Sequence, residues 1–249
     1  MTGTSQRMRL FGTLTRDLGP LCMGLLGLTA ALLVGCSGDE QTAPQAPIHA
    51  EGFTFFDVGA TTPFSDTLRE RLRKSLGPDA IAYRNIINLE VNGEGFLQDH
   101  FPDLHQLNLR LNTPPGERVE HNTVKLMYRY ARNNDLPFSY VELVFSNHTG
   151  RPLYIHIYSR RDIADVLRTL EDKFGKPNKI DLPQESGQAV YWRDKKNVLL
   201  ATIAPTRRGD QDYRLMIYFA DNIEQLVSLE EKERREKEEE RRRAGEKAF

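Results

Sequence analysis

The side chains in this chain that are best suited to chemistry are histidines close to carboxylates. His100 and His105 lie in the stretch 99–105, and His121 lies further along beside a glutamate. Imidazole and carboxylate groups bind zinc and exchange protons near neutral pH. The spacing matches no standard metal motif, and Pro102 disfavours a helix presenting both ligands on one face. We therefore expect a surface loop without metal or other cofactor. A metal or acid–base site at these three histidines is the alternative.

Other catalytic signatures are absent from the sequence. It has no Gly-x-Ser-x-Gly elbow, no His-Glu-x-x-His motif and no P-loop. Its two cysteines are Cys22 and Cys36, and neither is expected to be a free thiol in the mature protein. These absences favour a binding protein over an enzyme.

Cys36 follows Leu33, Val34 and Gly35 at the end of an apolar run. This pattern resembles the lipobox of bacterial lipoproteins. The resemblance implies that the Cys36 thiol receives a diacylglycerol carrying acyl chains such as palmitate. It also implies that a peptidase cleaves between Gly35 and Cys36, and that the acyl chains hold the protein at a membrane.

Residues 1–35 are predicted to be a signal peptide. Arginines precede an apolar segment at 18–34, which is short for a spanning helix. Ser37 follows the cysteine, and the absence of aspartate there favours the outer membrane, facing the periplasm. Residues 36–51 are predicted to be the lipidated cysteine and a polar, disordered tether.

The charge of the chain excludes few partners. The whole chain has 34 Lys and Arg against 35 Asp and Glu, and without residues 1–35 the balance is 31 against 34. Nothing here indicates nucleic acid as a partner. With no second cysteine in the mature chain, the domain cannot form an internal disulfide.

Residues 52–228 are predicted to form one α+β domain, an antiparallel sheet with helices packed on one face. Helices are predicted at 65–76 and 162–174, each ending at a glycine with proline soon after. Alternating or apolar runs predict strands at 81–91, 107–111, 124–130, 141–145, 153–157, 190–193, 198–203 and 213–219. Residues 53–56 are expected to be either a first strand or an apolar staple. Two diverged α-β-β-β units are one interpretation of this repeated pattern. The alternative is that the two helices end alike only because glycine and proline commonly end helices.

The stretch 159–219 resembles the small α+β domains of envelope lipoproteins, including the outer-membrane assembly accessory type. The similarity lies in a helix, the run Phe174-Gly175-Lys176-Pro177, and a strand containing Tyr191-Trp192. It implies a fold and an envelope setting, and no functional residue is transferred on its basis.

One strand carries a candidate binding face. If the apolar residues of 153–157 face the core, the residues between them form a stripe on the opposite face: Tyr154, His156 and Tyr158. Arg160 and Arg161 follow directly. An aromatic stripe with a basic edge suits a ligand or protein partner, although strands favour tyrosine in any case.

Residues 229–249 are predicted to form a solvent-exposed charged helix. Glu–Lys and Glu–Arg pairs recur at i,i+4 spacing, as in Glu230–Arg234, Glu231–Arg235, Glu233–Lys237, Glu238–Arg242 and Glu239–Arg243. No apolar stripe accompanies them, so the sequence supports neither a coiled coil nor a membrane-surface helix.

The sequence therefore favours a membrane-anchored envelope lipoprotein with a non-catalytic binding or assembly domain and an envelope protein as partner. The alternative is an envelope hydrolase using histidine and carboxylate residues around 99–121. A pocket where the three histidines meet would favour the enzyme, whereas an open aromatic sheet face would favour the binding protein.

Overall fold

The computed structural model describes residues 52–91, 93–131, 135–159, 161–182, 187–205 and 211–248. The chain divides into two units, Met1–Ala46 and Pro47–Phe249, and all described residues belong to the second. The predicted signal peptide, Cys36 and the tether lie outside the described residues, as does Arg160.

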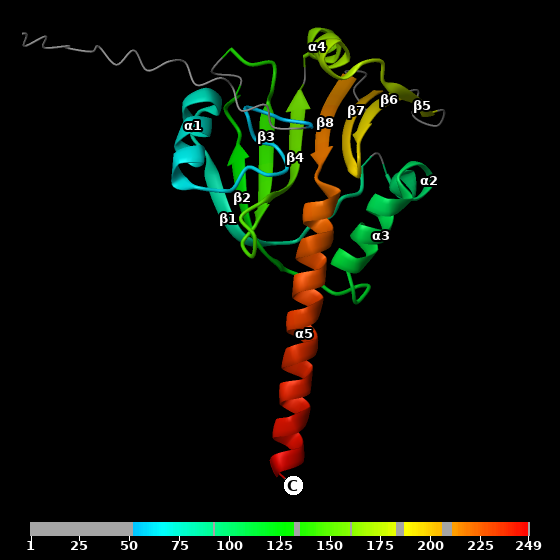
Figure 1. Cartoon of the computed structure of the whole chain (residues 1–249). Helices are drawn as coiled ribbons and strands as arrows, with labels where there is room; N and C mark the ends of the chain where they lie inside the picture. The colour runs from blue at the N-terminus through cyan, green and yellow to red at the C-terminus, as the bar shows by residue number, and fades with distance from the viewer. Residues whose placement is uncertain are drawn as a thin grey trace, which may run out of the picture. The chain divides into compact units, whose positions relative to one another are not determined.

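The described residues form one antiparallel sheet of eight strands, in the order β1-β2-β3-β4-β8-β7-β6-β5, with five helices (Figure 1). The strands are β1 (Ala80–Asn85), β2 (His121–Tyr128), β3 (Tyr140–Ser146), β4 (Pro152–Ser159), β5 (Asn178–Leu182), β6 (Gly187–Asp194), β7 (Asn197–Pro205) and β8 (Gln211–Tyr218). The helices are α1 (Asp66–Leu76), α2 (Phe96–His100), α3 (Pro102–Leu111), α4 (Ala164–Phe174) and α5 (Ala220–Ala248). The predicted α+β class is confirmed.

The sheet consists of two halves with the same order of elements. In the first half α1 precedes β1 to β4, and in the second half α4 precedes β5 to β8. Neighbouring strands pair antiparallel within each half, and β4 pairs with β8 to join the halves. Each half thus has four strands rather than the three of the predicted unit. The sequence pattern misses β5 because Ile180 is the one buried residue of this edge strand.

The helices that open the two halves end as their sequences predict. Ser65 caps α1, because its Oγ accepts a hydrogen bond from the Leu68 N–H at 3.1 Å. Both helices end at a glycine with positive φ, Gly77 at 86° and Gly175 at 79°. Glycine adopts this conformation without strain because it has no Cβ.

One face of the sheet, face A, packs against α1 and α4. Leu68, Leu72 and Leu76 of α1 are fully buried there with apolar residues of β2, β3, β4 and β8. The apolar residues of α4 pack on the same core but are only half-buried: Val166, Leu167, Leu170 and Phe174. The two helices therefore occupy equivalent places with unequal burial.

The opposite face, face B, packs against α2, α3 and the first turns of α5. Leu97, Phe101 and Leu104 are buried there in one cluster with apolar residues of β3 to β8. The expectation that helices cover a single face is therefore wrong. The run Val198–Ala201 in β7 is buried at every position, as a strand between two covered faces requires.

Residues 102–111 form helix α3, not the predicted strand at 107–111. Leu104, Leu107 and Leu111 are buried, whereas Leu109 is 49% exposed. Their spacing of three and four follows the helical period. Pro102 occupies the first turn, where its missing N–H costs no hydrogen bond.

Two further segments differ from the predicted strands. Residues 53–56 enter a tight turn closed by an isolated bridge between Phe55 and Val58. Strand β1 ends at Asn85, and the chain beyond it carries the buried side chains of Ile87 and Leu89 into face B without strand pairing.

Helix α5 begins in the core and continues as a charged helix. Ile223, Leu226 and Val227 are buried, which agrees with the predicted domain boundary at residue 228. Residues 232–248 are exposed. In the part of the chain that the structure describes, no helix has the length and apolar character needed to cross a bilayer.

Candidate functional site: a tyrosine face on one half of the sheet

The predicted aromatic stripe on β4 lies on face B and gains neighbours from the adjacent strands. Tyr158 pairs with Tyr140 of β3 and with Arg214 of β8. One step along, His156 pairs with Glu142 and with Met216. We name the polar and aromatic part of this surface the tyrosine face, consisting of Lys125, Tyr140, Glu142, Tyr154, His156, Tyr158 and Arg214.

Helices α2 and α3 pack towards the other half of the sheet, whereas the first turns of α5 contact both β4 and β7. Phe101, between α2 and α3, makes an edge contact with Tyr191 of β6 at a ring distance of 5.1 Å. Figure 1 shows α2 and α3 on the side of the sheet that carries β5 to β7. The tyrosine face is centred on β3, β4 and β8, and most of its side chains are half-buried.

Glu142 holds the centre of the tyrosine face together. The Tyr140 hydroxyl donates to its Oε2 at 2.7 Å, and the Tyr154 hydroxyl donates to its Oε1 at 2.9 Å. Lys125 Nζ lies 3.1 Å from the same Oε1. Burial alone would raise the pKa of Glu142, but the Tyr140 hydrogen bond and the Lys125 charge lower it further than burial raises it. The carboxylate is therefore ionised at neutral pH and orients both phenols.

The three tyrosines are neutral at physiological pH. Burial raises the pKa of Tyr140 and Tyr154, and the nearby Glu142 charge raises both further. Burial also raises the pKa of Tyr158, although Arg214 opposes this effect. Each therefore presents an apolar ring with one polar hydroxyl, a combination common where proteins bind other molecules.

The rings on β3 and β4 form a contiguous group with one cation. The His156 and Tyr158 ring centroids are 4.5 Å apart, and those of Tyr140 and Tyr158 are 5.7 Å apart. The Arg214 guanidinium lies 5.5 Å from the Tyr158 centroid and is held by Asp212 at 2.9 Å. Cation–π contact and ion pair together fix the guanidinium over the ring.

His156 is neutral in the folded protein. Burial lowers its pKa to about 4, against an ordinary value of 6.5. Its Nε2 atom is buried and has no hydrogen-bond partner among the described residues. A buried ring nitrogen without a partner is costly, so this position favours a neutral, ring-stacked imidazole.

Of the predicted basic edge, Arg161 is exposed beyond the end of β4, and its backbone N–H donates to Ser159 Oγ at 3.1 Å. Arg160 lies outside the described residues. The cation that the structure places against Tyr158 is Arg214. Sequence reasoning missed both Arg214 and Glu142, although each alternates with core residues in its own strand. What the sequence lacks is the pairing of β4 with β8, which brings Arg214 to Tyr158.

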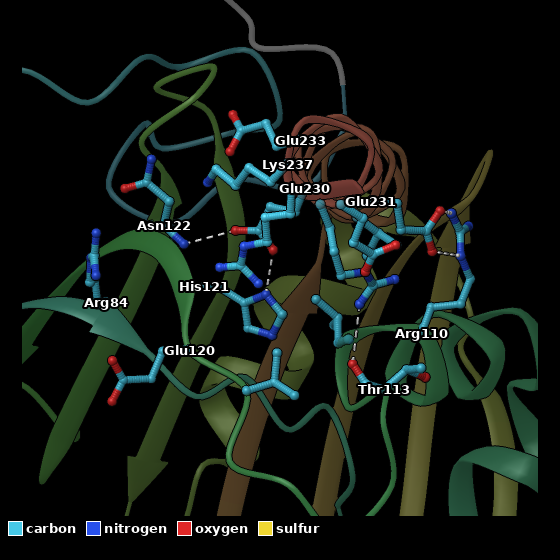
Figure 2. A pocket seen from close by; sticks show the side chains of 16 residues that line it. Arg84, Arg110, Thr113, Glu120, His121, Asn122, Glu230, Glu231, Glu233 and Lys237 are labelled. Atoms are coloured by element: carbon cyan, nitrogen blue, oxygen red, sulfur yellow. Dashed lines mark hydrogen bonds and ion pairs between the residues drawn. The ribbon is translucent and has the colours of Figure 1, made fainter. Parts of the chain in front are cut away.

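The three candidate metal-binding histidines do not meet. His100 is exposed at the end of α2, and His105 lies in α3, so the stretch 99–105 is helical rather than the expected loop. His121 is buried at the start of β2, where its Nδ1 lies 2.6 Å from Glu230 Oε2 of α5 (Figure 2). Across the described ranges, no group of three or more His, Cys, Asp or Glu residues is placed to hold a metal ion.

No protein-family model, curated protein or solved structure matches this chain. The resemblances to lipoproteins and to their small α+β domains therefore remain predictions from the sequence.

Proposed function

We propose that this protein is a lipid-anchored component of the bacterial envelope whose tyrosine face binds another envelope protein without catalysing a reaction. The observation that carries the proposal is the ordered group of half-buried rings around Tyr158, with Arg214 fixed over it. Tyr140 and Tyr158 lie outside the apolar cluster that contains α2 and α3, whereas Tyr154 is buried in it.

A protein partner suits the composition of this surface. Tyrosine and arginine are enriched among the residues that contribute most to protein interfaces. The charges of Glu142 and Arg214 are already paired with Lys125 and Asp212 respectively, so a partner need not neutralise them. The side chains are also held in place before binding, which reduces the entropy lost on association.

The predicted anchor defines where the partner would be found. Residues 37–51 would span about 50 Å if fully extended, at about 3.3 Å per residue. The domain would then work within that distance of the membrane bearing the acyl chains on Cys36. Several acyl chains give stable attachment where one chain binds only marginally.

Crosslinking in living cells tests the proposed interface. A photo-reactive phenylalanine analogue would replace Tyr158, and the matched control would replace Tyr83, which is 64% exposed on edge strand β1. We expect a discrete adduct from position 158, with a partner identified by mass spectrometry, and its loss in the Arg214→Ala variant. No adduct at 158, or the same adducts from both positions, would contradict the proposal.

The anchor has its own test. Cys36→Ala removes the sulfur that the lipobox presents for acylation, so incorporation of a fatty-acid probe should be abolished. Membrane attachment should be lost, or the precursor should remain uncleaved. Continued acylation of the variant would show that the lipobox assignment is wrong.

A further inference from the structure

A cleft of about 540 Å³ lies between α5 and the β1–β2 edge of the sheet (Figure 2). Its walls come from α5, the end of α3, the residues that lead into β2, and Arg84 of β1. This volume falls within the range of about 300–1,000 Å³ typical of small-molecule sites. The cleft shares no residue with the tyrosine face.

Two glutamates of α5 attach the helix to the cleft wall. Glu230 accepts hydrogen bonds from the His121 ring at 2.6 Å and the Asn122 N–H at 2.8 Å. Glu231 binds the Arg110 guanidinium through two contacts of 3.0 and 2.9 Å. These contacts attach α5 to the domain. Because both carboxylates are paired with donors of the protein, they repel a bound anion less than unpaired carboxylates would.

The other lining charges are unevenly paired. Glu120 lies 3.2 Å from Arg118, and Glu233 lies 3.4 Å from His148. In the described part of the chain, four lining cations have no carboxylate oxygen within 4.0 Å: Arg84, Arg234, Lys237 and Arg241. Glu238 is the one lining carboxylate in the same position. Arg234 also donates a hydrogen bond to the Thr113 carbonyl oxygen at 3.5 Å. Among the lining charges without an ion-pair partner in the described part of the chain, cations therefore outnumber carboxylates by four to one.

Arg84 occupies an unusual backbone conformation at the cleft. Tyr83 pairs with Val124 and Asn85 with His121, so β2 places two residues opposite Arg84 alone. This β-bulge coincides with a φ of 53° at Arg84, a left-handed conformation that is uncommon for residues other than glycine. Bulges redirect side chains and are frequent beside binding sites. Here the bulge lies where Arg84 lines the cleft.

We infer that this cleft binds a ligand carrying two or more phosphoryl groups. The α5 cations Arg234, Lys237 and Arg241 share the cleft side of the helix and extend over about 10 Å of its axis, at 1.5 Å per residue. A single small anion cannot reach both ends of this row and Arg84 as well. Arginine forks match phosphoryl oxygens in pairs. A soluble polyphosphorylated compound and the phosphorylated headgroups of a lipid surface offer the same chemistry.

The test uses the full chain in non-ionic detergent and treats the two sources separately. Tripolyphosphate is titrated by calorimetry. In a second arm, hydrogen exchange of residues 230–241 is compared in micelles doped with phosphatidylglycerol or with phosphatidylcholine. Two variants remove cations from different walls of the cleft. One is Lys237→Gln/Arg241→Gln, and the other is Arg84→Asn, because asparagine tolerates a positive φ.

Lys232→Gln/Arg235→Gln is the matched control, since it removes the same two charges from α5 at positions that do not line the cleft. We expect wild type and control to bind tripolyphosphate equally, and the double cleft variant to bind about tenfold more weakly. Protection by phosphatidylglycerol alone, lost in both cleft variants, would support a lipid headgroup. Failure of both probes to bind, or equal binding by the cleft variants, would overturn the inference.

Discussion

The two halves of the sheet have the same order of elements but opposite surroundings on face B. In the second half, α2 and α3 bury an apolar surface that includes Ala189 and Leu200. In the first half, β3 and β4 carry Glu142, His156 and the tyrosines on the same face. The covering helices are inserted between β1 and β2 of the first half, yet they pack on the second half.

This difference separates the structural role of face B from its proposed binding role. A surface under a helix must be apolar, because unpaired polar groups there would lose their hydrogen bonds to water. The tyrosine face instead pairs its Glu142 carboxylate with Tyr140 of the same strand and with Tyr154 and Lys125 of the neighbouring strands. The inserted helices thus stabilise one half while the other half can present an ordered surface to a partner.

The largest expected effect lies in the covered half. Leu200 of β7 is completely buried in the apolar cluster that includes the helices of face B. Leu200→Ala should lower the free energy of unfolding by about 2–5 kcal/mol, through lost burial and the cavity left behind. Chemical denaturation measures this change. A loss below about 1 kcal/mol would mean that α2 and α3 do not cover this strand as described.

In the first half of the sheet, His156 should make the stability of the protein depend on pH. The folded pKa of His156 is about 4 and its ordinary value is 6.5, so on acidification the unfolded state takes up a proton first. The His156 contribution is therefore complete above about pH 6.5 and falls as pH decreases towards 4, by at most about 3 kcal/mol.

His156→Gln should remove this part of the pH dependence, measured by denaturation at several pH values. His100→Gln provides a control at an exposed histidine on α2. If the wild type and His156→Gln lose stability in parallel between pH 6.5 and 4, the buried neutral state of His156 is wrong.

Two parts of helix α5 are expected to contribute differently to the stability of the protein. Deleting residues 235–249 should leave stability unchanged, because the described residues there are exposed. Deleting 230–249 should cost about 1–3 kcal/mol, since it leaves the buried His121 ring without its carboxylate partner. Thermal melts of the two truncations decide this point. Equal stability of both would show that Glu230 and Glu231 do not hold the helix to the domain.

Helices α1 and α4, which precede the two halves of the sheet, should differ in how much their buried leucines contribute to stability. Leu72 of α1 is completely buried, whereas Leu170 of α4 is half-buried. Leu170→Ala should cost about 1–2 kcal/mol, less than the roughly 2–5 kcal/mol expected for Leu72→Ala. Equal losses in paired denaturation curves would mean that α4 is packed as deeply as α1.

The sequence predicts the elements whose signals are local. The start of α1 near residue 65, the glycines after α1 and α4, and the alternation in β2 to β4 all depend on signals within a few residues. The alternation of Leu107, Leu109 and Leu111 fits a strand. The structure instead buries Leu104, Leu107 and Leu111, whose spacing of three and four is that of a helix. Short apolar runs leave this ambiguity unless burial on the second face is known.

The candidate sites depend on contacts between distant residues. Tyr154, His156 and Tyr158 share a face because of strand alternation, which the sequence shows. The partners Glu142 and Arg214 require the strand order, and the Glu230–His121 contact joins residues 109 positions apart. Of the five i,i+4 pairs predicted in the tail, the structure shows an ion pair for Glu239–Arg243, whereas Glu230 and Glu231 bind the domain.

The most direct test of the proposed binding face is hydroxyl-radical footprinting in native envelopes and on the purified full chain. Tyr140 and Tyr158 report on the tyrosine face, while Tyr83 and Tyr130, which are 64% and 53% exposed, report on other surfaces. A bound partner predicts that Tyr140 and Tyr158 are modified several-fold more slowly in the envelope, with Tyr83 and Tyr130 unchanged. Equal modification of Tyr140 and Tyr158 in both samples would contradict a partner on this face.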